Sequence, residues 1–183
     1  MEQKEGNRIL LHACCAICSA YPVEMLQKEG YDVVVYFYNP NIYPESEYLR
    51  RLEAERCLCS HFNVKLIEDN YDEKEFLNFV KGYEDCPEKG ARCTKCFELR
   101  LRKTAQLAQD MEIEKFTTSI VISPHKNFKI LSEIGEKIAK EFGLNYLAID
   151  FKKKDGFLKT NKIASSLKLY RQNYCGCRFS ENH

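Results

Sequence analysis

The sequence predicts an α/β protein built as a three-layer, doubly wound parallel sheet of five strands. Short apolar strands alternate with longer amphipathic helices along the whole chain, and this alternation is typical of βαβ units. The strands are continuous β-branched or aromatic runs, such as residues 31–38 (YDVVVYFY), which indicates burial on both faces. We expect residues 1–183 to form a single domain on which a basic C-terminal segment, residues 151–183, packs.

The composition is that of a globular protein, with 44% hydrophobic and 30% charged residues among 183. The longest apolar runs are far shorter than a membrane span, and the charged start of the chain is unlike a secretory signal. We therefore expect a cytoplasmic protein with no membrane partner. Ten cysteines in such a protein favour metal binding or redox chemistry over a disulfide scaffold.

The first strand leads directly into a thiol-rich turn, ILLHACCAIC at residues 9–18. Neighbouring residues on a strand point to opposite faces, so Cys14 and Cys15 can bind one metal only if the strand has already ended. The carboxyl ends of parallel strands are also where open α/β sheets place their active sites. The competing interpretation is that these cysteines are small apolar residues of the core.

The first half of the chain continues with alternating elements, each ended by turn residues. Pro22 is expected in the first turn of a helix that Gly30 stops, and Asp72 is expected to cap a later helix. Cys57 and Cys59 lie two residues apart on a helix, so they point away from each other and are interpreted as structural. The expected elements are a helix over 20–29, a strand over 31–38, a helix over 45–62, a strand over 64–67 and a helix from 72 to 80.

The second half repeats the pattern after a polar loop, residues 82–92. Cys93 and Cys96 share one face of the first turn of the next helix, and the positive helix end should lower the pKa of both thiols. Asn127 and Gly143 are expected to bound a later helix. The expected elements are a helix over 93–111, a strand over 116–122, a helix over 127–142, a strand over 145–150 and a basic helix over 159–170.

Four distinctive loops then fall at one edge of the predicted sheet. They are the Cys14–Cys15 turn, NPNIYP at 39–44, SPHKN at 123–127, and Asp150 at the end of the last strand. Because the carboxyl ends of parallel strands meet at the same edge, this convergence favours an active site over scattered structural thiols.

Cys14, Cys15, Cys93 and Cys96 supply four thiolates from two places, the number that tetrahedral zinc or a [4Fe–4S] cluster requires. A vicinal pair at a strand end is unlike the regular knuckles of structural zinc sites, and this favours the cluster. Cys18 could replace one of the four, since the spacing does not exclude it.

Cys175 and Cys177 flank a single glycine near the end of the chain. A disulfide between them closes a small strained ring, for which Gly176 supplies backbone freedom. Strained disulfides tend to be labile or catalytic. The alternative is a frayed tail with idle thiols.

The C-terminal segment 151–183 carries eight Lys or Arg against two acidic residues, although the whole chain carries only +1. Such a segment suits a phosphate-rich partner, and the alternative is a solvated basic face. The basic residues that we expect to contact nucleic acid are Lys152, Lys153, Lys154, Lys159, Lys162 and Arg171.

Six motifs, in this order, span nearly the whole chain: HACCAIC, YNPNIYP, RCTKCFELRL, SPHKN, DFKKKDG and YRQNYCGC. Together they resemble the QueH family of epoxyqueuosine reductases. Ile17 departs from the family pattern, which usually has proline there. The resemblance implies a fold of the HUP, or adenine nucleotide alpha hydrolase-like, type. It also implies a cytosolic oxidoreductase that reduces the epoxide of epoxyqueuosine in tRNA to give queuosine, the final step of queuosine biosynthesis.

The resemblance also implies roles for particular residues. Cys14, Cys15, Cys93 and Cys96 would hold a [4Fe–4S] cluster, and Cys175 and Cys177 would be the redox-active pair. An adjacent mononuclear iron would be completed by an aspartate, with Asp150 as the candidate and Asp85 as the alternative.

The expected mechanism is a two-electron deoxygenation, in which iron acts as the Lewis acid and the cluster supplies electrons. The departing oxygen needs a proton donor, for which Tyr43, His12 and His125 are candidates. The partners would be tRNA carrying epoxyqueuosine in its anticodon loop, with Tyr170 or Tyr174 stacking on bases, and an unidentified electron donor. The competing function is a zinc-binding RNA-binding module that is not an enzyme. A nucleotide-dependent sulfur-transfer enzyme would need a phosphate loop that HACCAIC cannot form.

Overall fold

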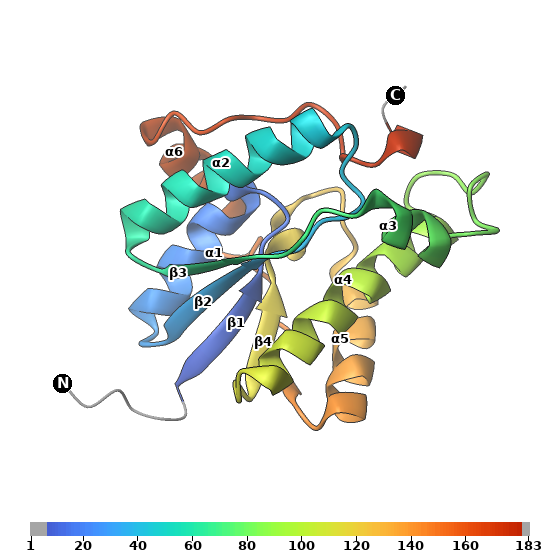
Figure 1. Ribbon diagram of the computed structural model, residues 1–183. Helices are drawn as coiled ribbons and strands as arrows, with labels where there is room; N and C mark the ends of the chain where they lie inside the picture. The colour runs from blue at the N-terminus through green and yellow to red at the C-terminus, as the bar shows by residue number, and fades with distance from the viewer. Residues whose placement is uncertain (1–6, 181–183) are drawn as a thin grey trace.

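The computed structural model describes residues 7–180 and contains one parallel sheet of five strands in the order β3-β2-β1-β4-β5. Central β1 pairs in parallel with β2 on one side and with β4 on the other. The predicted sheet is therefore confirmed (Figure 1). The strands are β1 (Arg8–His12), β2 (Asp32–Phe37), β3 (Lys65–Glu68), β4 (Lys115–Thr118) and β5 (Asn145–Tyr146).

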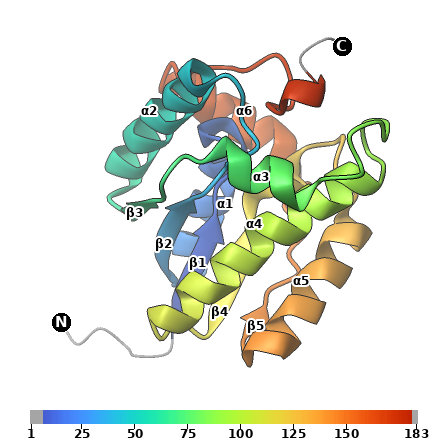
Figure 2. The ribbon, with the colours of Figure 1, turned by 45° about the vertical axis from the view of Figure 1, so that its right-hand side comes forward.

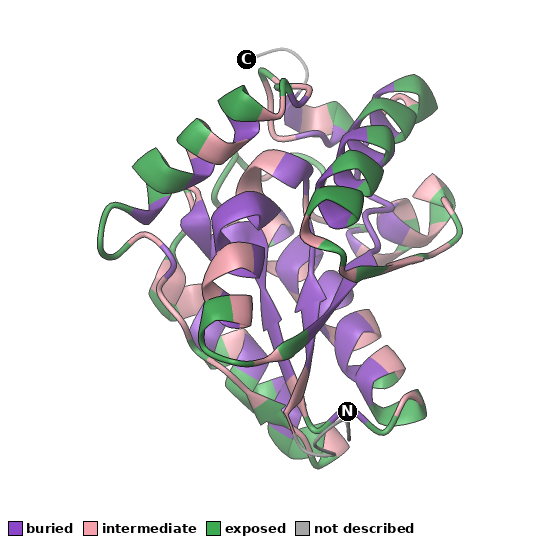
Figure 3. Cartoon of the chain, turned by 90° about the vertical axis from the view of Figure 1, so that its left-hand side faces the viewer, coloured by how far each residue is buried: buried purple, intermediate pink, exposed green. Residues whose placement is uncertain are grey.

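Helices cover both faces of the sheet, which confirms the three-layer arrangement (Figures 1 and 2). One layer contains α1 (Ala16–Lys28), α2 (Glu45–Phe62) and α6 (Gly156–Ser166), and the other contains α3 (Glu73–Phe79), α4 (Ala91–Asp110) and α5 (Phe128–Phe142). The three inner strands β1, β2 and β4 are largely buried between these layers, whereas the edge strands β3 and β5 are partly exposed (Figure 3). No helix within residues 7–180 has the length and apolar character needed to cross a bilayer.

The strand order places a topological switch point between β1 and β4. The chain leaves β1 toward β2 and β3, and then returns through α3 and α4 to β4 on the opposite side of β1. The loops that follow β1 and β4 therefore diverge, which opens a crevice at the carboxyl ends of the two strands. The turn with Cys14 and Cys15 follows β1, and Ser119 follows β4.

Helix α1 begins earlier than the sequence predicts. It starts at Ala16, with Cys15 as its extended N-cap residue. The predicted start at residue 20 was wrong because Pro22, taken as a first-turn residue, lies inside the helix. The turn after β1 is correspondingly short, and Cys18 lies in the first turn of α1.

The apolar run after β4 also differs from the prediction. Residues Ser119–Ile122 form a 3₁₀ turn, η1, in which the Thr118 hydroxyl accepts a hydrogen bond from the Ile120 amide at 3.2 Å. All four residues are buried, and a short buried run does not distinguish a strand from a helical turn by its periodicity.

Strand β5 is shorter than predicted, so Asp150 does not end a strand. The strand stops at Tyr146, and tight backbone bonds from Ile149 N to Leu147 O and from Phe151 N to Ile149 O turn the chain out of the sheet. The Asp150 carboxylate accepts a hydrogen bond from the Lys152 amide at 3.2 Å.

The caps follow the sequence more closely. Asp72 accepts a bond from the Lys74 amide, Asn127 accepts one from the Ile130 amide, and Gly143 ends α5 in the left-handed conformation. Helix α6 packs against α1 at Gly156, where a Cβ atom would lie 1.6 Å from the Phe151 carbonyl oxygen. Only glycine allows this close approach.

Candidate active site

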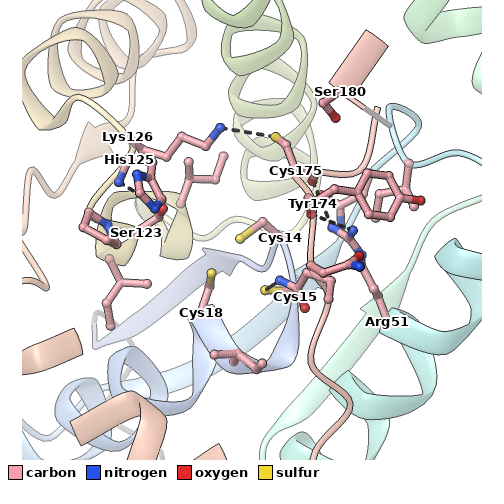
Figure 4. Close-up of a pocket in the computed structure, with 18 of the residues that line it drawn as sticks. Cys14, Cys15, Cys18, Arg51, Ser123, His125, Lys126, Tyr174, Cys175 and Ser180 are labelled. Carbon is pink, nitrogen blue, oxygen red and sulfur yellow. Dashed lines mark hydrogen bonds between the residues drawn. The ribbon is translucent and has the colours of Figure 1, made fainter. Parts of the chain in front are cut away.

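A cavity of about 570 Å³ opens at the carboxyl ends of β1 and β4. The turn after β1 contributes Cys14 and Cys15, α1 contributes Cys18, and the C-terminal segment contributes Cys175 from the opposite side (Figure 4). Lys126, from the loop after η1, reaches the same space. Segments far apart in the sequence thus meet at the switch point of the sheet.

Cys14, Cys15 and Cys18 form a close group of thiols. Their sulfur atoms all lie within 4.8 Å of one another. Cys15 is buried, and the other two are partly exposed to the cavity. Three sulfur donors on one wall suit a soft metal ion or an iron–sulfur cluster. Cys18 belongs to this group because α1 starts immediately after Cys15.

The three thiols differ in how readily they ionise. Hydrogen bonding with Cys15 and Cys18, aided by Ser119 and Arg100, holds the pKa of Cys14 well below its usual range. The same hydrogen bonds, together with burial, raise the pKa of Cys18 above its usual range. Cys14 is thus the thiol that this environment ionises first, and the thiolate is the form that binds metals.

A buried cation balances this negative charge. Arg100 is 5% exposed, and its guanidinium donates to the Cys96 carbonyl at 3.3 Å and to Asn39 Oδ1 at 3.5 Å. The thiolates of Cys96 and Cys14 raise its pKa against the opposing effect of burial. A buried guanidinium requires nearby negative charge, and the thiols on either side can provide it.

Cys93 and Cys96 line a smaller neighbouring cavity, together with Cys175 and Cys177. They do not belong to the close group of three sulfurs. Burial raises the pKa of Cys93, and it raises the pKa of Cys96 to about 11. The expectation that the helix end lowers the pKa of both thiols was therefore wrong, because burial outweighs the helix dipole.

The CGC segment is held in place by Arg51 of α2. This side chain, 3% exposed, donates to the Cys175 carbonyl at 3.0 Å and to the Tyr174 carbonyl at 3.1 Å. Gly176 has φ +123°, and a Cβ atom there would lie 2.9 Å from Arg51 Nη1. All ten cysteines lie within the described residues and have free thiols. Cys175 and Cys177 are thus ordered against α2.

His12 and Tyr43 do not line the larger cavity. His12 is fully buried between the Thr118 hydroxyl and the Tyr38 carbonyl, each 3.0 Å from a ring nitrogen. Burial and the charge of Arg100 lower its pKa to about 4, which keeps the ring neutral. The main chain of Tyr43 accepts a bond from the Tyr174 hydroxyl and donates one to Gly176 O. Their proposed roles as proton donors stay predictions.

The two candidate aspartates also lie outside the larger cavity. Asp150 is half-buried and caps a turn, whereas Asp85 is exposed in the loop before α4. Among the described residues that line the cavity, the acidic one is Glu88. The assignment of an aspartate to a second iron stays a prediction that this geometry does not strengthen.

The basic residues predicted to bind nucleic acid lie in and around α6. Lys153, Lys154, Lys159 and Lys162 are exposed. Lys152 donates to the Lys126 carbonyl at 3.2 Å, and Arg171 lines the cavity and bonds to Asn161 and Ser165.

Sequence reasoning missed the buried Arg51 and Arg100 and the half-buried Lys126 as members of the site. The signal for Arg51 and Arg100 was weak, because each is one basic residue on a charged helix. Lys126 could have been predicted, since it belongs to the SPHKN loop that was expected at the active edge of the sheet.

Solved structures with the same fold include tRNA-modifying proteins. U34-tRNA thiolase NcsA from Methanococcus maripaludis, with its [4Fe-4S] cluster, superposes with a TM-score of 0.61 at 12% identity, over 97% of this chain and 62% of its own. A predicted subunit of tRNA methyltransferase from Methanocaldococcus jannaschii gives 0.58 at 13% identity, over 84% and 74%. Identities this low support the fold alone, and the expected three-layer parallel α/β fold is confirmed.

Sequence comparisons are more specific. Proteins named epoxyqueuosine reductase QueH from Staphylococcus epidermidis and Streptococcus pyogenes are each 39% identical to this chain, over 97% of its length and over 79% and 72% of their own. The protein of that name from Dehalococcoides mccartyi is 39% identical over 95% of this chain and 92% of its own. The sequence model of the family described as epoxyqueuosine reductase QueH matches residues 9–183. The chain belongs to the epoxyqueuosine reductase QueH family of oxidoreductases.

Proposed function

We propose that this protein is a cytoplasmic enzyme that reduces the epoxide of epoxyqueuosine in tRNA to queuosine. The proposal rests on one observation: Cys14, Cys15, Cys18 and Cys175 line the same cavity at the switch point of the sheet. Membership of the QueH family supplies the reaction. A structural zinc site would not need a cavity of about 570 Å³ beside the thiols.

The donor set fits an iron–sulfur cluster. Three sulfur atoms lie within 4.8 Å of one another, and Arg100 supplies a buried positive charge that an anionic cluster would balance. We propose that Cys14 and Cys15 hold a [4Fe–4S] cluster with Cys93 and Cys96, and that Cys18 is available to replace one ligand. When bound, the cluster and an adjacent iron would supply the electrons and polarise the epoxide oxygen.

The residues of the chain would bind the substrate, donate protons and stabilise developing charge. Reduction of an epoxide to an alkene consumes two electrons and two protons and releases the oxygen as water. His125 is the one candidate donor among Tyr43, His12 and His125 that lines the cavity, and we propose it as a source of a proton. Arg100 would stabilise negative charge that develops on the departing oxygen.

The tRNA would approach over α6. Exposed Lys153, Lys154, Lys159 and Lys162 would contact phosphates there. Tyr170 and Tyr174 are less available for stacking than the sequence suggested, because the guanidinium groups of Arg50 and Arg51 lie 5.9 and 5.3 Å from the centres of their rings. Phe157, 46% exposed, lines the cavity beside these lysines and is the better candidate for contact with a base.

Turnover tests the proposal. Anaerobically purified protein, given a chemical reductant and tRNA that carries epoxyqueuosine, should yield queuosine in digests analysed by mass spectrometry. Cys14→Ser should abolish the product, whereas Cys57→Ser, at an exposed position, should leave it unchanged. Failure of protein with its full iron content to convert the nucleoside would overturn the proposal.

A further inference from the structure

The two thiols of the CGC segment have different surroundings. Cys175 lines the larger cavity and accepts a hydrogen bond from Lys126 Nζ at 3.2 Å (Figure 4). Cys177 is 7% exposed, does not line that cavity, and lies 3.5 Å from the Ser180 hydroxyl. A reagent in the cavity therefore reaches Cys175 and not Cys177.

Lys126 is fixed where it contacts Cys175. Its carbonyl accepts a bond from Lys152 Nζ at 3.2 Å, and its ammonium lies 5.8 Å from the centre of the Phe97 ring. Burial opposes the charge on Lys126, but attraction to the Cys175 thiolate raises its pKa above the usual value. Lys126 is thus held as a charged ammonium beside the Cys175 sulfur.

Other charged and ionisable groups surround Cys175. Arg51 of α2 holds its carbonyl, and Arg100 of α4 adds a second positive charge near its sulfur. The neighbouring thiols of Cys93, Cys96 and Cys177 would repel a thiolate when they ionise, and burial keeps the pKa of Cys93 and Cys96 raised. Lys126 is the cation that donates a hydrogen bond to the Cys175 sulfur.

We propose that Cys175 is the member of the pair that exchanges with an external dithiol reductant, and that Lys126 is a positioning residue that holds its sulfur through a hydrogen bond. The inference rests on the proposed function for the oxidising step: the pair would be the net source of the two electrons and two protons, which the metal centre and His125 would pass on, and the pair would become a disulfide. Neither thiol needs to ligate metal for this role.

The regeneration step balances as a thiol–disulfide exchange. A thiolate of the reductant attacks Cys175 Sγ, the bond to Cys177 breaks, and Cys177 leaves and takes up a proton. The second thiol of the reductant then attacks the mixed disulfide. Cys175 leaves as a thiolate beside Lys126, and the reductant departs as a disulfide.

Alkylation of the reduced holoenzyme tests the assignment without tRNA. Iodoacetamide should modify Cys175 at least tenfold faster than Cys177, as located by fragment ions of the peptide that contains both. Lys126→Gln, which loses the ammonium that donates to the Cys175 sulfur, should slow modification of Cys175 several-fold at pH 7. Lys126→Arg should restore most of the rate, and Lys129→Gln, whose side chain is 84% exposed, should change nothing.

A second measurement uses glutathione disulfide as the probe. Cys177→Ser should accumulate a mixed disulfide at Cys175, and Cys175→Ser should form one at Cys177 much more slowly. Equal rates at the two positions, or an unchanged rate of Cys175 modification in Lys126→Gln, would overturn the proposal. Normal labelling in a protein that fails to reduce epoxyqueuosine would overturn the proposed function and leave the thiol assignment standing.

Discussion

Glu55 is a fully buried carboxyl that is linked through two hydroxyl groups to Cys14. Ser19 Oγ lies 3.3 Å from Glu55 Oε2 and 3.5 Å from Ser119 Oγ, which lies 3.6 Å from Cys14 Sγ. Ser19 has a single proton, and the Cys15 carbonyl at 3.0 Å is its nearest acceptor. A protonated Glu55 would therefore be the donor to Ser19.

Burial, aided by the charge of Cys14, raises the pKa of Glu55 to about 8 from 4.5. The unfolded chain ionises this group first, so stability falls as pH rises from about 4.5 to about 8. Glu55→Gln removes this dependence. The variant should match the parent near pH 4.5 and exceed it by a few kcal/mol at pH 8, at about 1.4 kcal/mol per pKa unit. Urea unfolding across this range checks the prediction, and a difference that does not vary with pH would contradict it.

Substitution of Cys18 tests whether its sulfur is one of the metal ligands. Because its sulfur lies within 4.8 Å of those of Cys14 and Cys15, Cys18→Ser should change the visible spectrum of the metal centre and lower its iron content. Cys57→Ser is the matched control, since Cys57 is an exposed thiol elsewhere in the structure. An unchanged spectrum and iron content in Cys18→Ser would show that Cys18 plays no part in metal binding.

At the scale of elements, the CGC segment depends on Gly176. Its φ of +123° costs a substituted alanine roughly 1–3 kcal/mol, and the new Cβ would also meet Arg51 Nη1 at 2.9 Å. Gly176→Ala should therefore lose stability and displace Cys175 from Lys126. Thermal unfolding and the alkylation rate of Cys175 measure the two effects.

Gly82→Ala separates the effect of backbone strain from the effect of the contact between residue 176 and Arg51. Gly82 has φ +86°, and a Cβ atom there has nothing within 4 Å. It should show the cost of backbone strain without any change at Cys175. If both variants alkylate Cys175 like the parent, the contact between Gly176 and Arg51 does not position the thiol.

The elements of the fold were largely predictable because buried strands and amphipathic helices have different periods. Asp72, Asn127 and Gly143 marked helix ends by local chemistry. The errors in strand length arose where an apolar run left the sheet in a turn instead of continuing as a strand. Residues 119–122 stayed buried in a 3₁₀ turn, and the fifth strand stopped at Tyr146 although Leu147 and Ile149 continue its pattern.

For the whole molecule, the distribution of basic residues predicts how tRNA binds. Lys159 and Lys162 are exposed on α6 beside the cavity, whereas Lys137 and Lys140 are exposed on α5 in the other layer. Replacing the first pair with alanine should weaken tRNA binding and reduce the slope of log K against log salt by roughly 1.5, at about 0.7–0.9 per phosphate contact. The second pair serves as the control, and equal effects of the two would contradict the assigned surface.

The site was predictable in part, for a reason of topology. The carboxyl ends of parallel strands meet at one edge, so the turn with Cys14 could be placed there from the strand pattern alone. Arg51 and Arg100 could not, because their positions depend on how α2 and α4 pack over the sheet. The proximity of Cys175 to Lys126 likewise requires the path of the C-terminal segment across that edge.

The composition of the metal centre decides whether the thiol group holds a redox cofactor, as reduction of an epoxide requires. Iron, acid-labile sulfide and zinc should be measured in anaerobically purified protein. We expect about four sulfides and about four or five irons per chain, the content of one [4Fe–4S] cluster with or without an extra iron. Stoichiometric zinc without sulfide would contradict an iron–sulfur-dependent reductase and would identify the thiols as a structural zinc site.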